Sequence, residues 1–270
     1  MKYNCKLLFL ILILVLNSLD IYALEFKGDF KQGSFILGKT KPGAKVFIDK
    51  RKVRVSKDGY FAFGLDRDRK NDVRIKIINN AGEKNIVKKV FKRDYKIQRI
   101  DGLPPKKVTP PPEVYERIKK DNKLIGEARA INTSYEYFKD KFIYPLDKYI
   151  VTGVYGSQRI LNGKPRRPHY GIDFHAPEGT PVKAMMDGEV TLVHKDMYFT
   201  GGTVIFDHGH GISTLFMHMK DINVKVGQKV KQGQIVGTLG QSGRATGPHL
   251  DIRLNWFEVK LDPVTILNLN

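Results

Sequence analysis

Short apolar runs alternate with polar residues and turn-forming pairs between residues 25 and 100. This pattern predicts strands at 35–38, 45–48, 52–55, 60–63, 73–77 and 86–91. Asp58-Gly59 and the Asn-Asn-Ala-Gly segment at 79–82 predict tight turns between neighbouring strands. Strands of this length and spacing favour a small, Ig-like β-sandwich. The region contains no histidine and no catalytic cluster, so it is either an adaptor module or a purely structural appendage.

Residues 101–140 have a different texture. The stretch from Leu103 to Pro112 is rich in proline, which predicts an extended, semi-rigid linker. The stretch from Glu113 to Ala130 holds helix-forming residues with loosely periodic apolar positions, which predicts a helix. The helix could pack on one of the domains or act as a spacer, and the pattern leaves both open.

A second β-rich region begins near Phe142. Glycines recur there between β-branched runs, as at 188–193, 202–206 and 233–240. Such runs, separated by tight turns, predict an antiparallel β domain at 141–267. The chain is therefore predicted to be all-β, with two domains joined by the linker and helix.

The first 23 residues form a separate unit. Lys2 and Lys6 flank a basic start, residues 7–15 are almost entirely apolar, and Ala23 supplies a small residue at the end. This is typical of a secretory signal peptide cleaved after Ala23, and an uncleaved N-terminal anchor is the alternative. The single cysteine, Cys5, lies inside this segment, which excludes disulfides, thiol catalysis and cysteine-bound zinc in the mature chain.

Export changes how the charge is interpreted. The net charge is +19, from 47 basic and 28 acidic residues. Outside the cytoplasm, an anionic cell-wall polymer or a membrane surface is a better partner for such a chain than nucleic acid. Lysine used simply for solubility explains the charge equally well.

The candidate chemistry begins with a histidine and a carboxylate four residues apart, His169 and Asp173. Pro168, Gly171 and Ile172 argue against a helix, so the pair is predicted to straddle the entry to a strand. Nitrogen and oxygen ligands of this kind hold zinc in exported hydrolases. We therefore expect half of a zinc site here.

The other half is predicted about 80 residues further on, at His249 and Asp251. Residues two apart in a strand lie on the same face, so both side chains can point toward one site. His218 lies between the two halves and follows another strand-like run at 213–217.

A family resemblance covers residues 142–265. The blocks that carry it are 167–174 (RPHYGIDF), 179–184 (GTPVKA), 188–190 (GEV), 205–209 (IFDHG), 215–218 (LFMH), 226–233 (VGQKVKQG) and 243–250 (GRATGPHL). They resemble, in the same order, peptidase family M23, the lysostaphin-like or LytM-like zinc endopeptidases of bacterial cell walls. The resemblance implies an antiparallel β core with its site in a groove, and cleavage of peptide cross-links in peptidoglycan.

The resemblance also implies roles for single residues. His169 and Asp173 match the family's first two zinc ligands. His218 matches a histidine that helps to hold the attacking water or to stabilise the oxyanion. His249 matches the first histidine of the family's His-x-His pair, which acts as general base.

Asp251 is the departure from the pattern, because the family usually has a second histidine there as third zinc ligand. Aspartate can bind zinc through oxygen. Two carboxylates cancel the formal charge of the metal, however, so the centre becomes a weaker Lewis acid. We expect a slower enzyme, an altered metal preference, or a domain that binds the wall without cutting it; His249 could also turn to ligate. Two-domain members that resemble this chain share the aspartate.

The function predicted from these residues is a zinc-dependent endopeptidase of the periplasm or cell envelope. Its substrate would be the stem peptides of peptidoglycan, and other envelope proteins are possible partners. The alternative is an inactive, wall-binding regulator of a separate amidase. A third interpretation, a basic surface adhesin, rests on charge alone.

Other candidate side chains have plainer explanations. His175 is expected to line the groove or to pack, and His208 and His210 to flank Gly209 in a turn. Arg166 and Arg167 could contact substrate carboxylates, although solvated side chains are the commoner case.

Overall fold

A computed structural model describes residues 24–102 and 108–269. The predicted signal peptide, with Cys5, and residues 103–107 of the proline-rich stretch lie outside the described residues. Within the described ranges, no helix is both long enough and apolar enough to cross a membrane.

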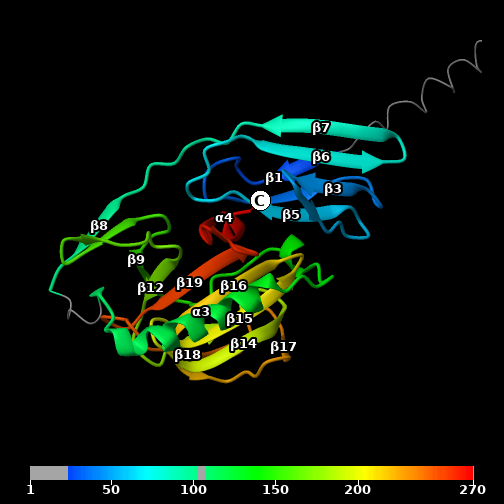
Figure 1. The fold of residues 1–270 in the computed structure, drawn as a ribbon. Coiled ribbons are helices and arrows are strands. Elements are labelled where there is room, and N and C mark those ends of the chain that lie inside the picture. The colour runs from blue at the N-terminus through cyan, green and yellow to red at the C-terminus, as the bar shows by residue number, and fades with distance from the viewer. Residues whose placement is uncertain (1–23, 103–107, 270) are drawn as a thin grey trace, which may run out of the picture.

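The N-terminal region consists of two antiparallel sheets whose apolar faces join one buried cluster (Figure 1). The first sheet has the order β1 (Glu25–Lys27), β2 (Phe35–Lys39), β5 (Tyr60–Gly64), and the second has the order β4 (Arg51–Val53), β3 (Lys45–Ile48), β6 (Val73–Asn79), β7 (Gly82–Lys88). In β6, Val73, Ile75 and Ile77 are buried while Arg74 between them is exposed, as the period of two predicts. The Ig-like assignment stays a prediction.

One strand of this region was placed too late in the sequence. β7 begins at Gly82 rather than at 86 and ends at Lys88 rather than at 91. Asn79 pairs directly with Gly82, so the ladder resumes immediately after a two-residue turn. The turn between β6 and β7 is therefore shorter than the predicted strand start at residue 86 indicated.

The C-terminal region is built on a ten-stranded, antiparallel sheet. Its main path is β17 (Lys229–Val230), β14 (Gly188–Met197), β15 (Gly201–Gly209), β16 (Ile212–Ile222), β19 (Leu250–Trp256), β12 (Ile172–His175), β9 (Ile150–Gly153). Three further strands join it off this path, namely β13 (Pro181–Lys183), β18 (Ile235–Leu239) and β20 (Val259–Leu261). The all-β prediction is confirmed.

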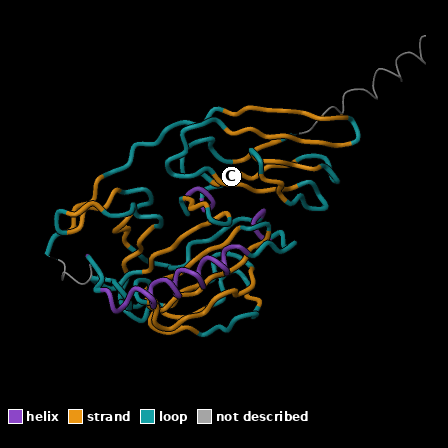
Figure 2. The backbone as a smooth tube through the Cα atoms, viewed as in Figure 1, coloured by secondary structure: helices purple, strands orange, loops and turns teal. Residues whose placement is uncertain are grey.

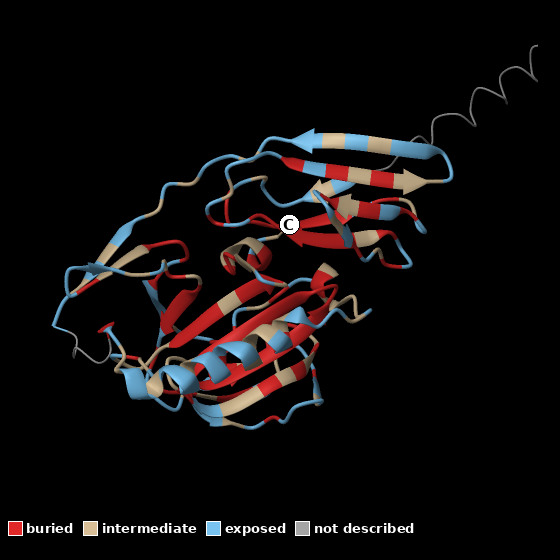
Figure 3. Cartoon of the chain, in the orientation of Figure 1, coloured by how far each residue is buried: buried red, intermediate tan, exposed pale blue. Residues whose placement is uncertain are grey.

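The central strands are covered on both faces. Every residue of β15 is buried, and Figure 3 shows β15, β16 and β19 as the most continuously buried strands. Helix α3 (Tyr115–Ala130), preceded by the turn η1 (Pro112–Val114), runs across the sheet in Figure 2. Its Ala128 packs with Ile205 and Leu215. The predicted helix therefore packs on the C-terminal sheet and is not a free spacer.

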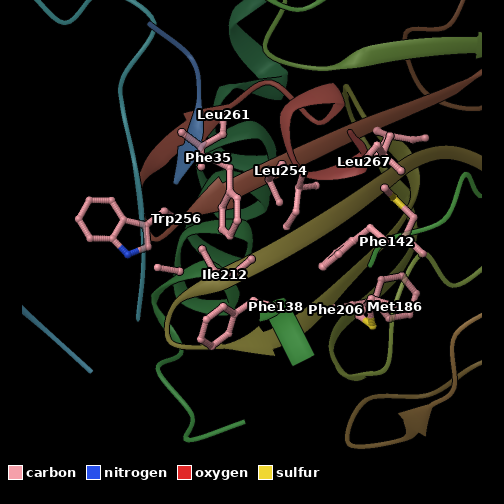
Figure 4. Packing of buried hydrophobic residues seen from close by; sticks show 14 of the residues in the cluster. Phe35, Phe138, Phe142, Met186, Phe206, Ile212, Leu254, Trp256, Leu261 and Leu267 are labelled. Carbon is pink, nitrogen blue, oxygen red and sulfur yellow. The ribbon is translucent and has the colours of Figure 1, made fainter. Parts of the chain in front are cut away.

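The two regions also share a core, which Figure 4 shows from close by. The rings of Phe63 in β5 and Trp256 in β19 lie 6.5 Å apart. Phe35 and Leu261 are fully buried nearby, next to the short helix α4 (Val264–Leu267). Burying each large apolar side chain contributes about 1.5–3 kcal/mol. The N-terminal sheets are therefore docked on the C-terminal sheet rather than tethered loosely to it.

The segment that leaves the sandwich returns to the C-terminal domain before the linker. Its strand β8 (Ile97–Ile100) pairs in parallel with β10 (Gln158–Leu161), which also pairs with β11 (Lys164–Pro165). No strand was predicted at residues 97–100, which lie at the end of the range assigned to the N-terminal domain, and their ladder partner lies some 60 positions later in the sequence. This strand forms one wall of the candidate site described next.

Candidate metal centre

The candidate ligands lie on neighbouring strands of the large sheet. Asp173 is in β12 and Asp251 in β19, and the register places the two residues directly opposite each other. His169 lies in the loop that enters β12, so the prediction that the pair straddles a strand entry is confirmed. The structure thus brings together residues that are 82 positions apart in the sequence.

The three side chains have the geometry of a metal site. The Nε2 atom of His169 lies 3.0 Å from Oδ1 of Asp173 and 3.4 Å from Oδ2 of Asp251. One ligand atom from each of the three residues lies within 4.8 Å of the others. Ligands bound tetrahedrally at zinc distances of about 2.0–2.2 Å are separated by about 3.3–3.6 Å, close to what is seen here.

Hydrogen bonding supports the same interpretation. His169 is 1% exposed; its Nε2 faces the two carboxylates, and among the described residues neither ring nitrogen makes a well-aligned hydrogen bond. The Oδ1 atom of Asp173 is also buried without a partner. Buried polar atoms are nearly always satisfied, so unpartnered nitrogen and oxygen atoms aimed at one point fit a metal ligand set. The residues present therefore fit a divalent cation.

Electrostatics explains how two buried carboxylates tolerate each other. Like charges opposite each other in a sheet are destabilising unless cations compensate them. Arg253 lies 3.1 Å from Asp251, and Arg159 lies 3.4 Å from Asp173. Burial acts to raise the pKa of Asp251, but Arg253 and His169 together hold that pKa well below its usual range. Asp251 is consequently ionised, as a metal ligand must be.

The same charges act on the histidine. Burial alone would lower the pKa of His169, but the carboxylates of Asp251 and Asp173 raise it above its usual value. A proton and a metal would compete for the Nε2 atom of His169, since only a neutral imidazole ligates.

Two glycines leave room for the carboxylates. A Cβ atom on Gly153 would lie 2.1 Å from Oδ2 of Asp173, and one on Gly171 would lie 2.2 Å from Oδ1 of Asp251. Any larger residue would push a carboxylate out of the site. Gly171 lies inside the motif that pointed to the site, but its role is visible only once β19 is in place.

His218 and His249 lie together beside the three candidate ligands, with ring centroids 4.7 Å apart. The Nδ1 atom of His218 donates to the Ser242 carbonyl (2.9 Å), and that of His249 donates to the Gly247 carbonyl (2.8 Å). In a neutral ring this leaves Nε2 free to accept a proton. Burial lowers the pKa of His218 to about 4, so that ring is neutral.

The backbone at His218 is unusual. Its φ is +64°, in the left-handed region that non-glycine residues seldom adopt. Backbone strain of this kind collects at functional sites, where surrounding structure enforces it. The Nε2 atom of His249 lies 4.0 Å from Oδ1 of Asp173, whereas Nε2 of His169 lies 3.0 Å from the same oxygen.

The remaining candidates lie elsewhere or act structurally. His175 is exposed, and its Nδ1 donates to the Pro248 carbonyl at 2.7 Å. The turn prediction is right for His210 but wrong for His208. His208 lies in β15, and its side chain is hydrogen-bonded to the Asp187 carbonyl and to Thr214 inside the fold. Arg166 is not simply solvated, since it donates to the Val108 carbonyl at 3.1 Å. Arg167 is exposed.

Several other residues of the site were not singled out by sequence reasoning. Arg159, Arg244 and Arg253 line the same pocket as Asp173 and Asp251. Gln98 and Ile100 reach it from β8. No spacing rule links these residues, although Arg244 lies inside the 243–250 block and Arg253 follows closely after it.

Comparison with known proteins agrees with this geometry. Residues 167–263 match the sequence model of peptidase family M23, a range that contains all three candidate ligands and both neighbouring histidines. The chain contains a peptidase family M23 domain. That the domain is mostly β and antiparallel, as the resemblance implied, is confirmed by its sheets.

Named relatives match through the M23 domain. The peptidoglycan DD-endopeptidase ShyA of Vibrio cholerae is 40% identical over 113 residues, which make up 41% of this chain and 26% of that protein. The DD-carboxypeptidase/endopeptidase Mpg of Neisseria meningitidis is 36% identical over 100 residues, 37% of this chain and 23% of that protein. The chain spans about a quarter of the length of these relatives.

A solved structure extends the likeness beyond the M23 domain. A Pseudomonas aeruginosa structure assigned to peptidase M23 superposes with a TM-score of 0.69 at 24% identity. The match covers 88% of this chain and 95% of that one. The two chains therefore share a fold that includes the region N-terminal to the M23 domain.

Proposed function

We propose that this protein is a zinc-dependent endopeptidase that cleaves peptide cross-links of bacterial peptidoglycan in the periplasm or cell envelope. The observation that carries the proposal is His169, buried between two ionisable carboxylates with neither ring nitrogen in a well-aligned hydrogen bond, inside an M23 domain. The named activities of the relatives support the same reaction and substrate class.

In this proposal His169, Asp173 and Asp251 hold the metal. A bound zinc ion supplies Lewis-acid polarisation of the scissile carbonyl and lowers the pKa of its water. Asp251 takes the place of the third histidine, and Arg253 keeps it ionised. Gly153 and Gly171 keep the space that the two carboxylates need.

His249 and His218 would manage protons. The Nδ1–H of each ring is fixed on a carbonyl, so each Nε2 can accept a proton or a hydrogen bond. His249 fits the general base, which later returns the proton to the leaving amine. For His218, a neutral ring with a free Nε2 lone pair favours holding the attacking water over donating to an oxyanion.

The test is digestion of purified sacculi by the purified protein, with and without a chelator, followed by analysis of the released muropeptides. We expect new peptide ends that a chelator prevents and added zinc restores. A His169→Ala variant should release none. Retained binding to sacculi without chelator-sensitive cleavage would instead favour a wall-binding regulator.

Metal analysis tests the unusual ligand separately. An Asp251→Ala variant should lose most of its zinc, whereas Asp187→Ala, which removes a carboxylate that pairs with Lys231 outside the site, should keep it. Unchanged zinc in Asp251→Ala would remove Asp251 from the ligand set and leave the other two residues in place.

A further inference from the structure

Three arginines converge on the pocket that holds the candidate metal ligands. Arg159 in β10, Arg253 in β19 and Arg244 in the loop before β19 all line it. Asp173 and Asp251 are the acidic side chains of that lining, and the remaining residues are neutral or histidine. The pocket is therefore positive even before a cation is added.

Metal binding would leave these arginines without counter-charges. A divalent cation takes up the two negative charges of Asp173 and Asp251, which are the partners of Arg159 and Arg253. Three guanidinium groups then face the same space uncompensated. An anion that enters beside the metal would be attracted to them in a partly desolvated site.

Arg244 is the arginine most available to such an anion. Within the described part of the chain its guanidinium makes no ion pair and no hydrogen bond, and it lies over the Phe199 ring at 4.6 Å. Its backbone N–H donates to the Phe199 carbonyl at 2.9 Å, which fixes the start of the side chain. Burial, followed by repulsion from Arg159 and Arg253, lowers the pKa of Arg244 to about 10.

Two further polar atoms are left without partners in the described residues. The Nε atom of Arg159 is a buried, unused donor, and the Oε1 atom of Gln98 is a buried, unused acceptor. Gln98 comes from β8, which holds the wall opposite the large sheet. Unused donors and an unused acceptor beside a metal site suit a ligand with a carboxylate and an amide N–H, as a peptide has.

We propose that Arg244 and Arg159 bind a carboxylate of the peptide substrate on a residue next to the scissile bond. Guanidinium groups match carboxylates with paired, charge-assisted hydrogen bonds. The inference rests on the proposed function, which supplies the peptide substrate. It adds a requirement that cleavage of a peptide bond does not itself impose. The substrate must carry a free carboxylate close to the bond that is cut.

The test compares two synthetic peptides that end in D-Ala-D-Ala, one with a free C-terminal carboxylate and one with a carboxamide. Binding is measured by calorimetry on the zinc-loaded His249→Ala variant, so that nothing is cleaved. We expect the amide to bind about 10- to 100-fold more weakly, as loss of a charged hydrogen-bonding partner predicts. Arg244→Gln, added to His249→Ala, should weaken the free acid similarly and leave the amide unchanged.

Matched variants separate charge from folding. Arg244→Lys should recover part of the preference for the free acid, because it keeps charge but not the paired hydrogen bonds. Arg74→Gln removes an exposed arginine of the sandwich and should change nothing. Equal binding of both peptides, or no binding of either, would overturn the subsite.

The two proposals fail in different ways. If the wild-type protein cleaves sacculi in a chelator-sensitive manner while the two peptides bind equally, the subsite is wrong and the endopeptidase stands. If the free acid is preferred through Arg244 but sacculi are never cut, the subsite stands and the endopeptidase is wrong.

Discussion

Two buried histidines of the C-terminal domain, His169 and His208, are each 1% exposed. In His208 both nitrogens are satisfied, with Nδ1 donating to the Asp187 carbonyl and Nε2 accepting from Thr214, each at 2.8 Å. In His169 neither nitrogen makes a well-aligned hydrogen bond among the described residues, and two carboxylates lie beside it.

The difference shows that burial by itself does not identify a functional histidine. A buried ring whose hydrogen bonds are complete stabilises the fold. A buried ring whose Nε2 faces two carboxylates, with neither nitrogen in a well-aligned hydrogen bond, is arranged to bind a cation. The two positions should therefore respond differently to substitution. Replacing His169 should change metal content and activity, and replacing His208 should change stability.

The largest expected contrast is in metal content and activity. His169→Ala should lose zinc and reduce sacculus cleavage by on the order of 10³-fold or more, because the metal leaves with its ligand. His208→Ala should keep zinc and lose about 2–3 kcal/mol of unfolding free energy, because it leaves a cavity and unsatisfied partners. Elemental analysis, muropeptide release and urea unfolding measure the three quantities. Equal zinc loss in both variants would erase the distinction.

The next effect concerns the two histidines beside the ligands. His249→Ala and His218→Ala should each lower kcat by about 10²- to 10⁴-fold through loss of proton transfer, while zinc content stays unchanged. Kinetics on isolated cross-linked muropeptides, together with metal analysis of the same samples, checks this. Loss of zinc from His249→Ala would mean that His249 has turned to ligate.

A smaller effect should appear in the pH dependence of stability. Burial lowers the pKa of His208 to about 4, against about 6.5 in an unfolded chain. The unfolded state therefore binds the extra proton between these values, so unfolding free energy falls as pH drops from 6.5 toward 4. His208 accounts for about 3 kcal/mol of this loss.

Urea unfolding with chelator present, at intervals from pH 7 to pH 4, measures the slope for wild type and for His208→Gln. The unfolding free energy of the variant should fall less steeply as the pH drops. Part of the fall should remain, because the pKa values of His210 and His218 are also lowered to about 4. Identical slopes would show that the pKa of His208 is the same in the folded and unfolded states, so that burial does not lower it.

The smallest effect is expected at an exposed histidine near the same site. His175→Ala removes one hydrogen bond, to the Pro248 carbonyl, and should cost about 1 kcal/mol or less. Zinc content should equal that of wild type. A clear fall in bound zinc would make His175 a ligand and extend the site beyond the His169 group.

Much of the architecture could be predicted from local patterns in the sequence. Alternating positions such as those of β6 predicted strands, glycine-containing turns separated them, and the strand-entry position of His169 and Asp173 followed from Pro168 and Gly171. These features depend on local backbone preference and on which face of a strand is apolar. The order of the M23 blocks further indicated the family of the domain.

Other features depend on how distant strands pair, which local pattern does not specify. The register of β12 on β19 set Asp173 opposite Asp251, and parallel pairing of β8 with β10 carried Gln98 into the pocket wall. Docking on the sheet settled whether the helix was a spacer. Whether a buried histidine is satisfied depends on atoms contributed by distant strands, so only the assembled sheet separates His169 from His208.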